Sequence, residues 1–427
     1  MPTYRIETLG CKANLYDSRR LSEALEDLGY RAAEEGETAD LCILNSCTVT
    51  GGADRKSRQQ AGRLARENPG ARVYVTGCYA SASPEELREV DGVRGVFGRK
   101  EWAALLREVT GGACRPTDVA GEFGIGSFDG RTRAFMKIQE GCDAFCSYCI
   151  LPRVRGAPRS RPLADVRAEA ERLAAAGFAE IVLTGIHLGF YGRGRGPQAT
   201  LAAAVTAVAE TEGVERVRLS SLEPDEVDEP LLGAMAHQAV CPHLHLPLQS
   251  GSTGVLERMN RRYTPEEFMS VVDLVRRRLD RPAISTDVMV GFPGETDADF
   301  EATLQLCREA RFSRMHVFPF SPRPGTRAAE MDGRVHSRVV NERSRRLREL
   351  GDRMAADWAR GFVGRDVRVL FERRDEEGRL RGYTDRYVRL RAEGAESLVG
   401  RAVRARVTGS EGSSLRGALT EPNCASP

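Results

Sequence analysis

Residues 135–152 read FMKIQEGCDAFCSYCILP, a short apolar run followed by three closely spaced cysteines. The apolar run is typical of a buried strand. Cys142, Cys146 and Cys149 can bind three irons of a four-iron cluster, whereas iron–sulfur proteins with no substrate at the metal usually supply four cysteines. The missing ligand leaves one iron open for a substrate or cofactor, as in catalytic metal sites. The alternatives at this point are a zinc site without its fourth ligand and a chance spacing.

The chain after this loop alternates between strands and helices. Strand-like apolar runs recur at 180–185, 217–220, 243–246, 283–286 and 315–318. Strands that alternate with helices predict a parallel sheet with right-handed crossovers, and this number of them predicts a complete or partial (βα) barrel. Helices are expected over 165–176 and 337–358.

Three segments before residue 90 share another pattern: an extended apolar run, a cysteine, and then a polar helical stretch. The cysteines are Cys11, Cys47 and Cys78. The same alternation predicts a parallel sheet, in which every strand ends on the edge where ligands bind, so the three cysteines can converge on one point. Cys42 lies inside its predicted strand and is expected to be packed, not a ligand. The helices are expected over 17–28 and 55–66, and from about residue 83.

Composition marks two boundaries along the chain. Residues 111–129 are rich in Gly, Pro and Asp, which is typical of a linker. From about residue 362 the sequence pattern changes to short alternating strands separated by turns, which predicts a small β-barrel. We therefore expect an α/β protein of three domains: a parallel α/β domain over 1–115, the partial (βα) barrel over 128–360, and the small β-barrel over 361–427.

The overall composition restricts the class of protein. Of 427 residues, 41% are hydrophobic and 29% charged, the balance of a soluble globular protein. No run approaches the roughly 18 apolar residues of a membrane helix, and the first ten residues do not resemble a signal peptide, so a cytoplasmic location is expected. Eleven cysteines in such a chain are not expected to form a disulfide framework, because the cytosol keeps thiols reduced. The net charge of +2 gives no global argument for nucleic acid.

The cysteine loop CDAFCSYC (142–149), with LP and RG following it, resembles the radical S-adenosylmethionine superfamily. In that superfamily the open iron binds the amino and carboxylate groups of S-adenosylmethionine, and one electron from the cluster produces a 5′-deoxyadenosyl radical. The resemblance implies that the three cysteines of the loop hold the catalytic cluster and that Tyr148 lies against the adenine. Thr184 and Gly185 match the place where the cofactor's amino group is held. Plain packing of the tyrosine and a simple turn at the glycine are the alternatives.

The motifs TLGCKANLYDS, ADLCILNSCTVT and VYVTGCYA resemble the N-terminal domain of the methylthiotransferases. The resemblance implies that Cys11, Cys47 and Cys78 hold a second four-iron cluster. HLHLPLQSGS, MNRRYTPEEF, STDVMVGFPGET and HVFPFSPRPGT follow in the expected order, and the C-terminal barrel resembles the TRAM domain, a small RNA-binding module. The resemblance therefore covers nearly the whole chain.

Within this family the motifs look most like the branch that acts on N6-threonylcarbamoyladenosine at position 37 of tRNA. This resemblance implies radical transfer of a methylthio group to carbon 2 of the adenine. It also implies two [4Fe-4S] clusters, S-adenosylmethionine, the tRNA anticodon stem-loop, and an unidentified electron donor and sulfur source. The alternatives are the branches acting on isopentenyladenosine or on a ribosomal-protein aspartate. A different class is an iron–sulfur electron-transfer or RNA-binding protein, which would not cleave S-adenosylmethionine.

Four arginines follow the cysteine loop within nine residues: Arg153, Arg155, Arg159 and Arg161. They could contact phosphates at the mouth of the barrel, and a guanidinium could bind the threonylcarbamoyl carboxylate in a bidentate manner. Arg153 and Arg155 are the candidates for substrate binding. The alternative is a solvated loop or intramolecular ion pairs. The histidines beside the barrel strands are expected to fill core or rim positions: His187, His243 and His245.

Overall fold

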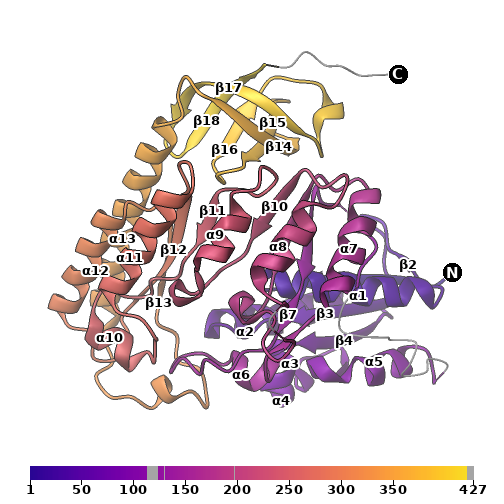
Figure 1. The fold of residues 1–427 in the computed structure, drawn as a ribbon. Coiled ribbons are helices and arrows are strands. Elements are labelled where there is room, and N and C mark those ends of the chain that lie inside the picture. Colours follow the sequence, from indigo (N-terminus) through magenta and orange to yellow (C-terminus); the bar gives the residue numbers. More distant parts are fainter. Residues whose placement is uncertain (113–123, 129, 197, 421–427) are drawn as a thin grey trace.

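The computed structural model of the chain describes residues 1–112, 124–128, 130–196 and 198–420. Three units pack together: an α/β unit at the N-terminus, a central unit of parallel strands and outer helices, and a small β-barrel at one end (Figure 1). The predicted fold class is therefore confirmed. Most of the linker expected at 111–129 lies outside the described residues.

The N-terminal unit is a parallel sheet in the order β2-β1-β3-β4-β5, covered by helices on both faces. Side chains of β3 alternate between two apolar clusters: Ile43 packs with α1 and α5, and Cys42 packs with α2. Cys42 is fully buried and is a core residue, as predicted. The strands are β1 (Thr3–Thr8), β2 (Arg31–Ala32), β3 (Leu41–Ser46), β4 (Arg72–Gly77) and β5 (Val93–Val96). The helices are α1 (Lys12–Asp27), α2 (Gly51–Glu67), α3 (Cys78–Ala82), α4 (Pro84–Arg88) and α5 (Trp102–Val109).

The helix that follows each N-terminal cysteine begins earlier than the sequence predicts. α1 begins at Lys12 and not at residue 17, because Gly10 turns the chain at φ 102° and Cys11 takes the N-cap position. α2 begins at residue 51, where the Thr50 side chain caps the amide of Ala53. α3 begins at its cysteine and precedes the helix predicted near residue 83. Each cysteine therefore lies close to the junction of a strand and a helix.

In the described part of the central unit, six parallel strands form two sheets, β6-β9-β10 and β11-β12-β13. Parallel bridges from Val217 to Val240 and from Ser221 to His245 join the two sheets, which gives the predicted partial barrel. The strands are β6 (Arg133–Lys137), β9 (Glu180–Thr184), β10 (Arg216–Leu219), β11 (His243–His245), β12 (Ala283–Val290) and β13 (Arg314–Pro319). The outer helices are α7 (Leu163–Ala175), α8 (Leu201–Ala209), α9 (Glu229–Met235), α10 (Thr253–Arg258), α11 (Pro265–Arg278) and α12 (Asp297–Ala310).

One large apolar core lies between these strands and the outer helices. Phe268 of α11, Phe300 of α12 and Phe312 before β13 are almost completely buried in it. Burying an aromatic side chain of this size contributes about 1.5–3 kcal/mol, so the core holds the strand ends in fixed positions. None of the helices in the described ranges is long and apolar enough to cross a membrane.

The C-terminal unit is a closed five-stranded barrel, which confirms the prediction for this region. The long helix α13 (Ser337–Arg360) runs along the central unit and leads into the C-terminal barrel (Figure 1). The strand order is β14-β15-β16-β18-β17. The strands are β14 (Asp366–Arg374), β15 (Leu380–Thr384), β16 (Arg389–Ala392), β17 (Ala402–Glu411) and β18 (Ser414–Leu419).

Buried charges join this barrel to the amino ends of the central strands. Glu180 at the start of β9 pairs with Arg216 at 2.8 Å and with Arg218 at 2.9 Å. The same arginines donate to backbone carbonyl groups of the C-terminal barrel, Arg216 to Tyr383 at 3.1 Å and Arg218 to Asp385 at 2.9 Å. One carboxylate therefore orients both arginines across the joint.

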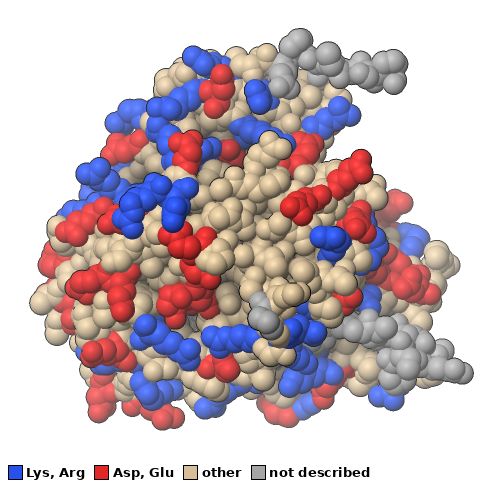
Figure 2. Space-filling view, in the orientation of Figure 1, with Lys and Arg blue, Asp and Glu red and all other residues tan. Residues whose placement is uncertain are grey.

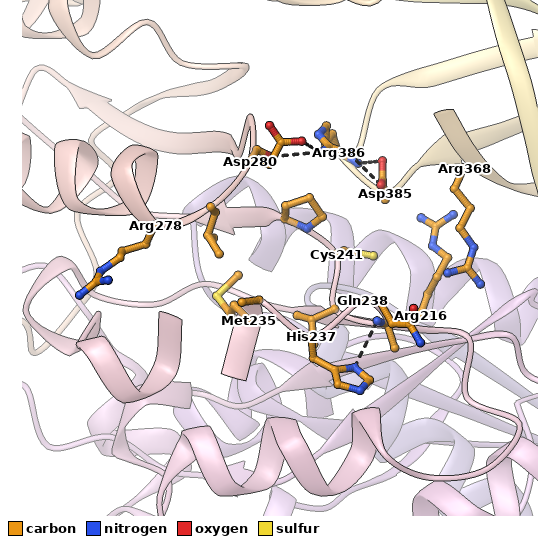
Figure 3. A pocket seen from close by; sticks show the side chains of 15 residues that line it. Arg216, Met235, His237, Gln238, Cys241, Arg278, Asp280, Arg368, Asp385 and Arg386 are labelled. Atoms are coloured by element: carbon orange, nitrogen blue, oxygen red, sulfur yellow. Dashed lines mark hydrogen bonds and ion pairs between the residues drawn. The ribbon is translucent and has the colours of Figure 1, made fainter. Parts of the chain in front are cut away.

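A pocket of about 290 Å³ lies beside this joint (Figure 3). Arg386 of the C-terminal barrel pairs there with Asp280 at 3.3 Å and with Asp385 at 2.8 Å. Arg368 also lines the pocket, and its guanidinium pairs with Glu215 of the central unit at 2.8 Å. The joint thus depends on charged side chains from both units.

Candidate metal centres and substrate cavity

The structure brings Cys11, Cys47 and Cys78 together at the carboxyl edge of the N-terminal sheet. The sulfurs of Cys11 and Cys78 each lie 3.9 Å from the same oxygen, Oδ1 of Asn14. A Cβ atom added at Gly10 would lie 2.9 Å from the sulfur of Cys47. The three thiols therefore face one small volume, as the strand pattern predicted.

Glycines in the left-handed region set the direction of three of the six cysteines. Gly10, Gly77 and Gly141 have φ of 102°, 101° and 77°, and each immediately precedes a cysteine. A Cβ atom at Gly77 would lie 2.5 Å from Oδ1 of Asn45, and one at Gly141 would lie 2.1 Å from the carbonyl oxygen of Ala157. Only glycine fits these positions, because any side chain would meet both backbone strain and a clash.

Arg155 reaches the N-terminal cysteines from the central unit. Its guanidinium is fully buried, and its Nε donates to the sulfur of Cys78 at 3.3 Å. Its Nη1 pairs with Asp17 at 2.8 Å and with Glu140 at 3.2 Å, and its Nη2 donates to Asn14. Burial opposes the charge, but Cys78 and the two carboxylates raise the pKa of Arg155 well above its ordinary value. A side chain buried in this way is not available for the substrate contact that the sequence predicts for Arg155. The alternative prediction, intramolecular ion pairing, agrees with the structure.

The other arginines of this stretch differ in exposure. Arg161 is buried and pairs with Glu169 at 2.7 Å. Arg153 is exposed and, within the described part of the chain, its side chain has neither a hydrogen bond nor an ion pair. It lies over Gly325, whose added Cβ would meet its guanidinium. Arg153 therefore stays a candidate for contact with substrate.

The second set of cysteines lies in the loop between β7 (Gln139–Glu140) and α6 (Leu151–Arg155). The sulfur of Cys142 is 3.2 Å from Nδ1 of His187 and accepts the backbone amide of Ala144 at 3.4 Å. The sulfur of Cys146 accepts from Arg261 at 3.5 Å. A turn closes the loop, because the amide of Cys149 donates to the carbonyl of Cys146 at 3.0 Å.

Two carboxylates just after β10 hold the side chains that contact this loop. Glu226 pairs with His187 at 2.5 Å, and Glu223 pairs with Arg261. Burial opposes protonation of His187, yet its contacts with Cys142 and Glu226 raise its pKa to about 9. The sequence predicted a core or rim role for His187 and missed its contact with Cys142. It also missed Arg261 and Glu223, although Arg261 lies within the motif MNRRYTPEEF.

The residues predicted to bind the cofactor surround the same loop. Tyr148 is half-buried and packs edge-on to Phe292, with ring centroids 6.5 Å apart. Thr184 is buried at the end of β9, and a Cβ atom at Gly185 would lie 2.9 Å from Oε1 of Gln139. Gln139 also donates to the carbonyl of the glycine that precedes Cys142, at 2.8 Å. The end of β9 therefore adjoins the cysteine loop, while the cofactor roles stay predictions.

The donors around both cysteine sets fit an anionic iron–sulfur cluster. Cationic N–H groups point at sulfur in each: Arg155 at Cys78, and Arg261 at Cys146. Such hydrogen bonds and charges are the usual means by which proteins stabilise metal-bound thiolates. Within the described ranges, no group of three His, Cys, Asp or Glu side chains is arranged around a single metal ion.

A cavity of about 300 Å³ lies where the three units meet. Its walls come from β10, β11, β12 and β13, from Lys12 of α1 and from Tyr387 of the C-terminal barrel. Lys12 directly follows Cys11 in the chain. Ser221, on another wall, precedes by two residues Glu223, which holds the arginine at Cys146. Two segments of the cavity wall therefore lead along the chain to residues at the cysteine sets.

The charged side chains around this cavity favour an anionic ligand. The side chains of Lys12 and Arg314 have no hydrogen bond or ion pair in the part of the chain that the structure describes. Burial lowers the pKa of Lys12, so a nearby anion would stabilise its charged form. Asp287 is already engaged, at 3.3 Å from His245 and 3.5 Å from His316. The expected rim position of His245, and of His243 beside it, agrees with their place in the cavity wall.

A row of arginines, the arginine row, crosses four strands of the C-terminal barrel. Arg373 pairs in register with Arg381, Arg381 with Arg391, and Arg391 with Arg416. Burial, with the charges of neighbouring arginines, lowers the pKa of Arg381. Like charges opposite one another destabilise a sheet, whereas a phosphate backbone would neutralise them. Figure 2 shows basic side chains over this barrel, at the top of the view.

Comparison with known families divides the chain as the structure does. Residues 3–98 match the family described as Uncharacterized protein family UPF0004, residues 136–307 the Radical SAM superfamily, and residues 360–420 the TRAM domain. Among solved structures, the radical S-adenosylmethionine methyltransferase TsrM from Kitasatospora setae has a TM-score of 0.56 at 18% identity, covering 77% of this chain and 74% of that chain. This likeness shows a shared fold.

Curated relatives match over nearly the full length. Threonylcarbamoyladenosine tRNA methylthiotransferase MtaB of Bacillus subtilis is 37% identical over 95% of this chain and 94% of its own. The MtaB protein of Thermotoga maritima is 38% identical over 91% of each chain. A tRNA-2-methylthio-N(6)-dimethylallyladenosine synthase of Parafrankia sp. is 39% identical over 90% of this chain and 80% of its own. These relatives are enzymes, and the chain belongs to the radical S-adenosylmethionine methylthiotransferase family.

Proposed function

We propose that this enzyme transfers a methylthio group to carbon 2 of N6-threonylcarbamoyladenosine at position 37 of tRNA. Relatives of two branches match it almost equally well, so identity alone does not choose the substrate. The cavity supports the threonylcarbamoyladenosine branch, because Lys12 and Arg314 line it and have no hydrogen bond or ion pair among the described residues. The threonylcarbamoyl group carries a carboxylate that could pair with them, whereas an isopentenyl group is apolar and would leave the half-buried Lys12 without a counter-charge.

Each cysteine set would hold one [4Fe-4S] cluster: Cys11, Cys47 and Cys78 one, and Cys142, Cys146 and Cys149 the other. Cys142, Cys146 and Cys149 would hold the cluster that, with S-adenosylmethionine bound, would supply the carbon-radical chemistry needed at the unactivated C–H bond of carbon 2. Tyr148, Thr184 and Gly185 would hold this cofactor beside the loop.

The chain's own residues position the reactants. His187 and Arg261, fixed by Glu226 and Glu223, would keep two ligand sulfurs in place and exclude water from them. The target base would leave its stack and enter the cavity, where Lys12 and Arg314 orient its anionic substituent. The arginine row would bind the anticodon stem-loop through phosphates, independently of sequence. A tRNA substrate also implies a cytoplasmic enzyme.

The direct test is mass spectrometry of nucleosides from tRNA of a host with and without this chain. We expect 2-methylthio-N6-threonylcarbamoyladenosine to disappear from tRNA when the chain is removed. Loss of 2-methylthio-isopentenyladenosine instead would overturn the branch assignment. Purified enzyme should also release 5′-deoxyadenosine when it is reduced with S-adenosylmethionine.

Lys12→Gln tests whether the cavity binds the carboxylate. Losing one charge-assisted contact costs about 1.5–3 kcal/mol, so kcat/KM on threonylcarbamoylated tRNA should fall roughly ten- to a hundredfold. Binding of tRNA that lacks the group should change little. Lys56→Gln, which removes an exposed lysine of α2, is the matched control. Equal weakening of both tRNAs, with iron content unchanged, would make Lys12 a phosphate contact and remove the basis for the substrate choice.

A further inference from the structure

The side chain of Arg155 connects the two cysteine sets. Arg155 ends α6, the short helix that directly follows the loop of Cys142, Cys146 and Cys149. Its Nε nevertheless donates to the sulfur of Cys78, in the N-terminal unit, at 3.3 Å. One buried guanidinium therefore belongs to the loop of one set by sequence and contacts a ligand sulfur of the other set in space.

Buried carboxylates fix this guanidinium from two different units. Asp17 of α1 lies 2.8 Å from its Nη1, and both oxygens of Glu140 lie 3.2 Å from the same atom. Glu140 itself is held by Lys137 at 2.8 Å and Arg99 at 2.9 Å. The guanidinium cannot swing away from Cys78 without breaking several buried ion pairs, each costly to leave unmade.

We propose that Arg155 is a positioning residue that sets the reduction potential of the cluster on Cys11, Cys47 and Cys78. The inference rests on the proposed first cluster and does not depend on the choice of tRNA base. A cation and an N–H donor at a ligand sulfur stabilise the more negative, reduced form of a cluster, which raises its potential. An arginine that only completes an ion-pair network would stabilise the fold without this effect on potential.

The readout is a potentiometric titration of the first cluster, followed by electron paramagnetic resonance. The full-length protein with Cys142, Cys146 and Cys149 all replaced by Ala isolates that cluster and should hold about four irons. In this background Arg155→Gln should lower the midpoint potential, with the reduction equilibrium shifting about tenfold, which corresponds to about 59 mV for one electron. Arg155→Lys keeps the charge but loses the Nε donor, so it should shift the equilibrium less.

Arg153→Gln is the matched control, because Arg153 is exposed two residues away and should leave the potential unchanged. If Arg155→Gln does not fold or does not hold iron, Arg155→Lys decides: a lowered potential supports the proposal, and a parental potential overturns it. An unchanged potential in an iron-loaded Arg155→Gln protein also overturns it. Absence of iron from the parent protein would overturn the first cluster itself, a result distinct from a failed choice of substrate.

Discussion

Gly10 controls where the first cysteine points, and it offers a test of the N-terminal site that involves no ligand residue. A Cβ atom at Gly10 would lie 2.9 Å from the sulfur of Cys47, in addition to the strain of φ 102°. We expect Gly10→Ala to push the sulfur aside and lower the iron content of reconstituted protein from about eight to about four per chain. Iron analysis and the absorbance of the clusters measure this loss.

Gly36→Ala separates the clash from the backbone strain. Gly36 has φ 83°, yet no atom lies within 4 Å of its added Cβ. A side chain there costs about 1–2 kcal/mol of backbone strain, as at Gly10, but touches nothing. The Gly36→Ala protein should keep all its iron; if it loses as much as Gly10→Ala, local unfolding explains both results and the cysteine geometry is not tested.

The sequence identifies the cysteines but not the side chains that contact them. Spacing and strand ends are local signals, so Cys142, Cys146 and Cys149 can be grouped from the order of residues alone. Arg155 meets Cys78, which lies 77 residues earlier in the chain, and no local pattern indicates that pairing. The same arginine, predicted from its neighbours to bind substrate, is buried, because charge density along a sequence says nothing about which carboxylates fold against it.

Strand β9 contributes one residue, Glu180, to the joint between the central unit and the C-terminal barrel. Burial raises the pKa of Glu180, but Arg216, Arg218 and Arg133 outweigh it and lower the pKa to about 2. A carboxyl whose folded pKa is depressed contributes stability that is present above its unfolded pKa, about 4.3, and lost as pH falls toward the folded value. We expect the wild type to lose about 2 kcal/mol more than Glu180→Gln between pH 6 and pH 3.

Urea unfolding at several pH values measures this difference. Trp358 packs against Phe362 at the start of the C-terminal barrel, with ring centroids 5.3 Å apart, so its fluorescence reports that unit once Trp102 is replaced by Phe. Glu215→Gln is the control, because Glu215 pairs across the same joint but is exposed. Parallel pH profiles for wild type and Glu180→Gln would mean that the carboxylate does not support the joint.

Strands were easier to predict than helix starts. Runs of buried apolar residues mark β3, β4 and β9 within a residue or two, because burial on both faces of a parallel sheet leaves little choice of side chain. The starts of α1 and α3 were missed, since Cys11 and Gly77 at their N-caps are not the Ser, Thr, Asp or Asn that usually mark a helix start. Cys11 and Cys78 lie at these helix starts, so the local rule fails at the proposed cluster site.

At the scale of the whole molecule, contacts that sequence patterns do not specify join the three units. Arg323, in the segment after β13, donates to Thr48 at 2.7 Å and pairs with Asp54 at 2.5 Å, just beyond Cys47. Lys12 brings the N-terminal unit to the cavity, and Tyr387 brings the C-terminal barrel. The order of the three units could be predicted from their motifs, but not that all three contribute to the wall of one cavity.

The arginine row predicts how tRNA binding by the whole molecule depends on salt concentration. If Arg381 and Arg391 each contact a phosphate, Arg381→Gln and Arg391→Gln should each lower the slope of log Kd against log salt concentration by about 0.7–0.9. The loss should be the same with or without the threonylcarbamoyl group, because a phosphate contact does not read the base. Filter binding at four salt concentrations, with both tRNAs, measures it.

The stability of the same variants separates a binding surface from a structural one. Arg381 faces Arg373 and Arg391 in register, so removing its charge relieves repulsion and should leave the C-terminal barrel as stable as before or more stable by about 0.2–1 kcal/mol. Arg345→Gln on α13 is the control, because that exposed arginine pairs with Glu342 and Glu349. It should change neither the salt slope nor tRNA affinity. If the slope stays unchanged while the barrel loses stability, the arginines serve the fold and tRNA binds elsewhere.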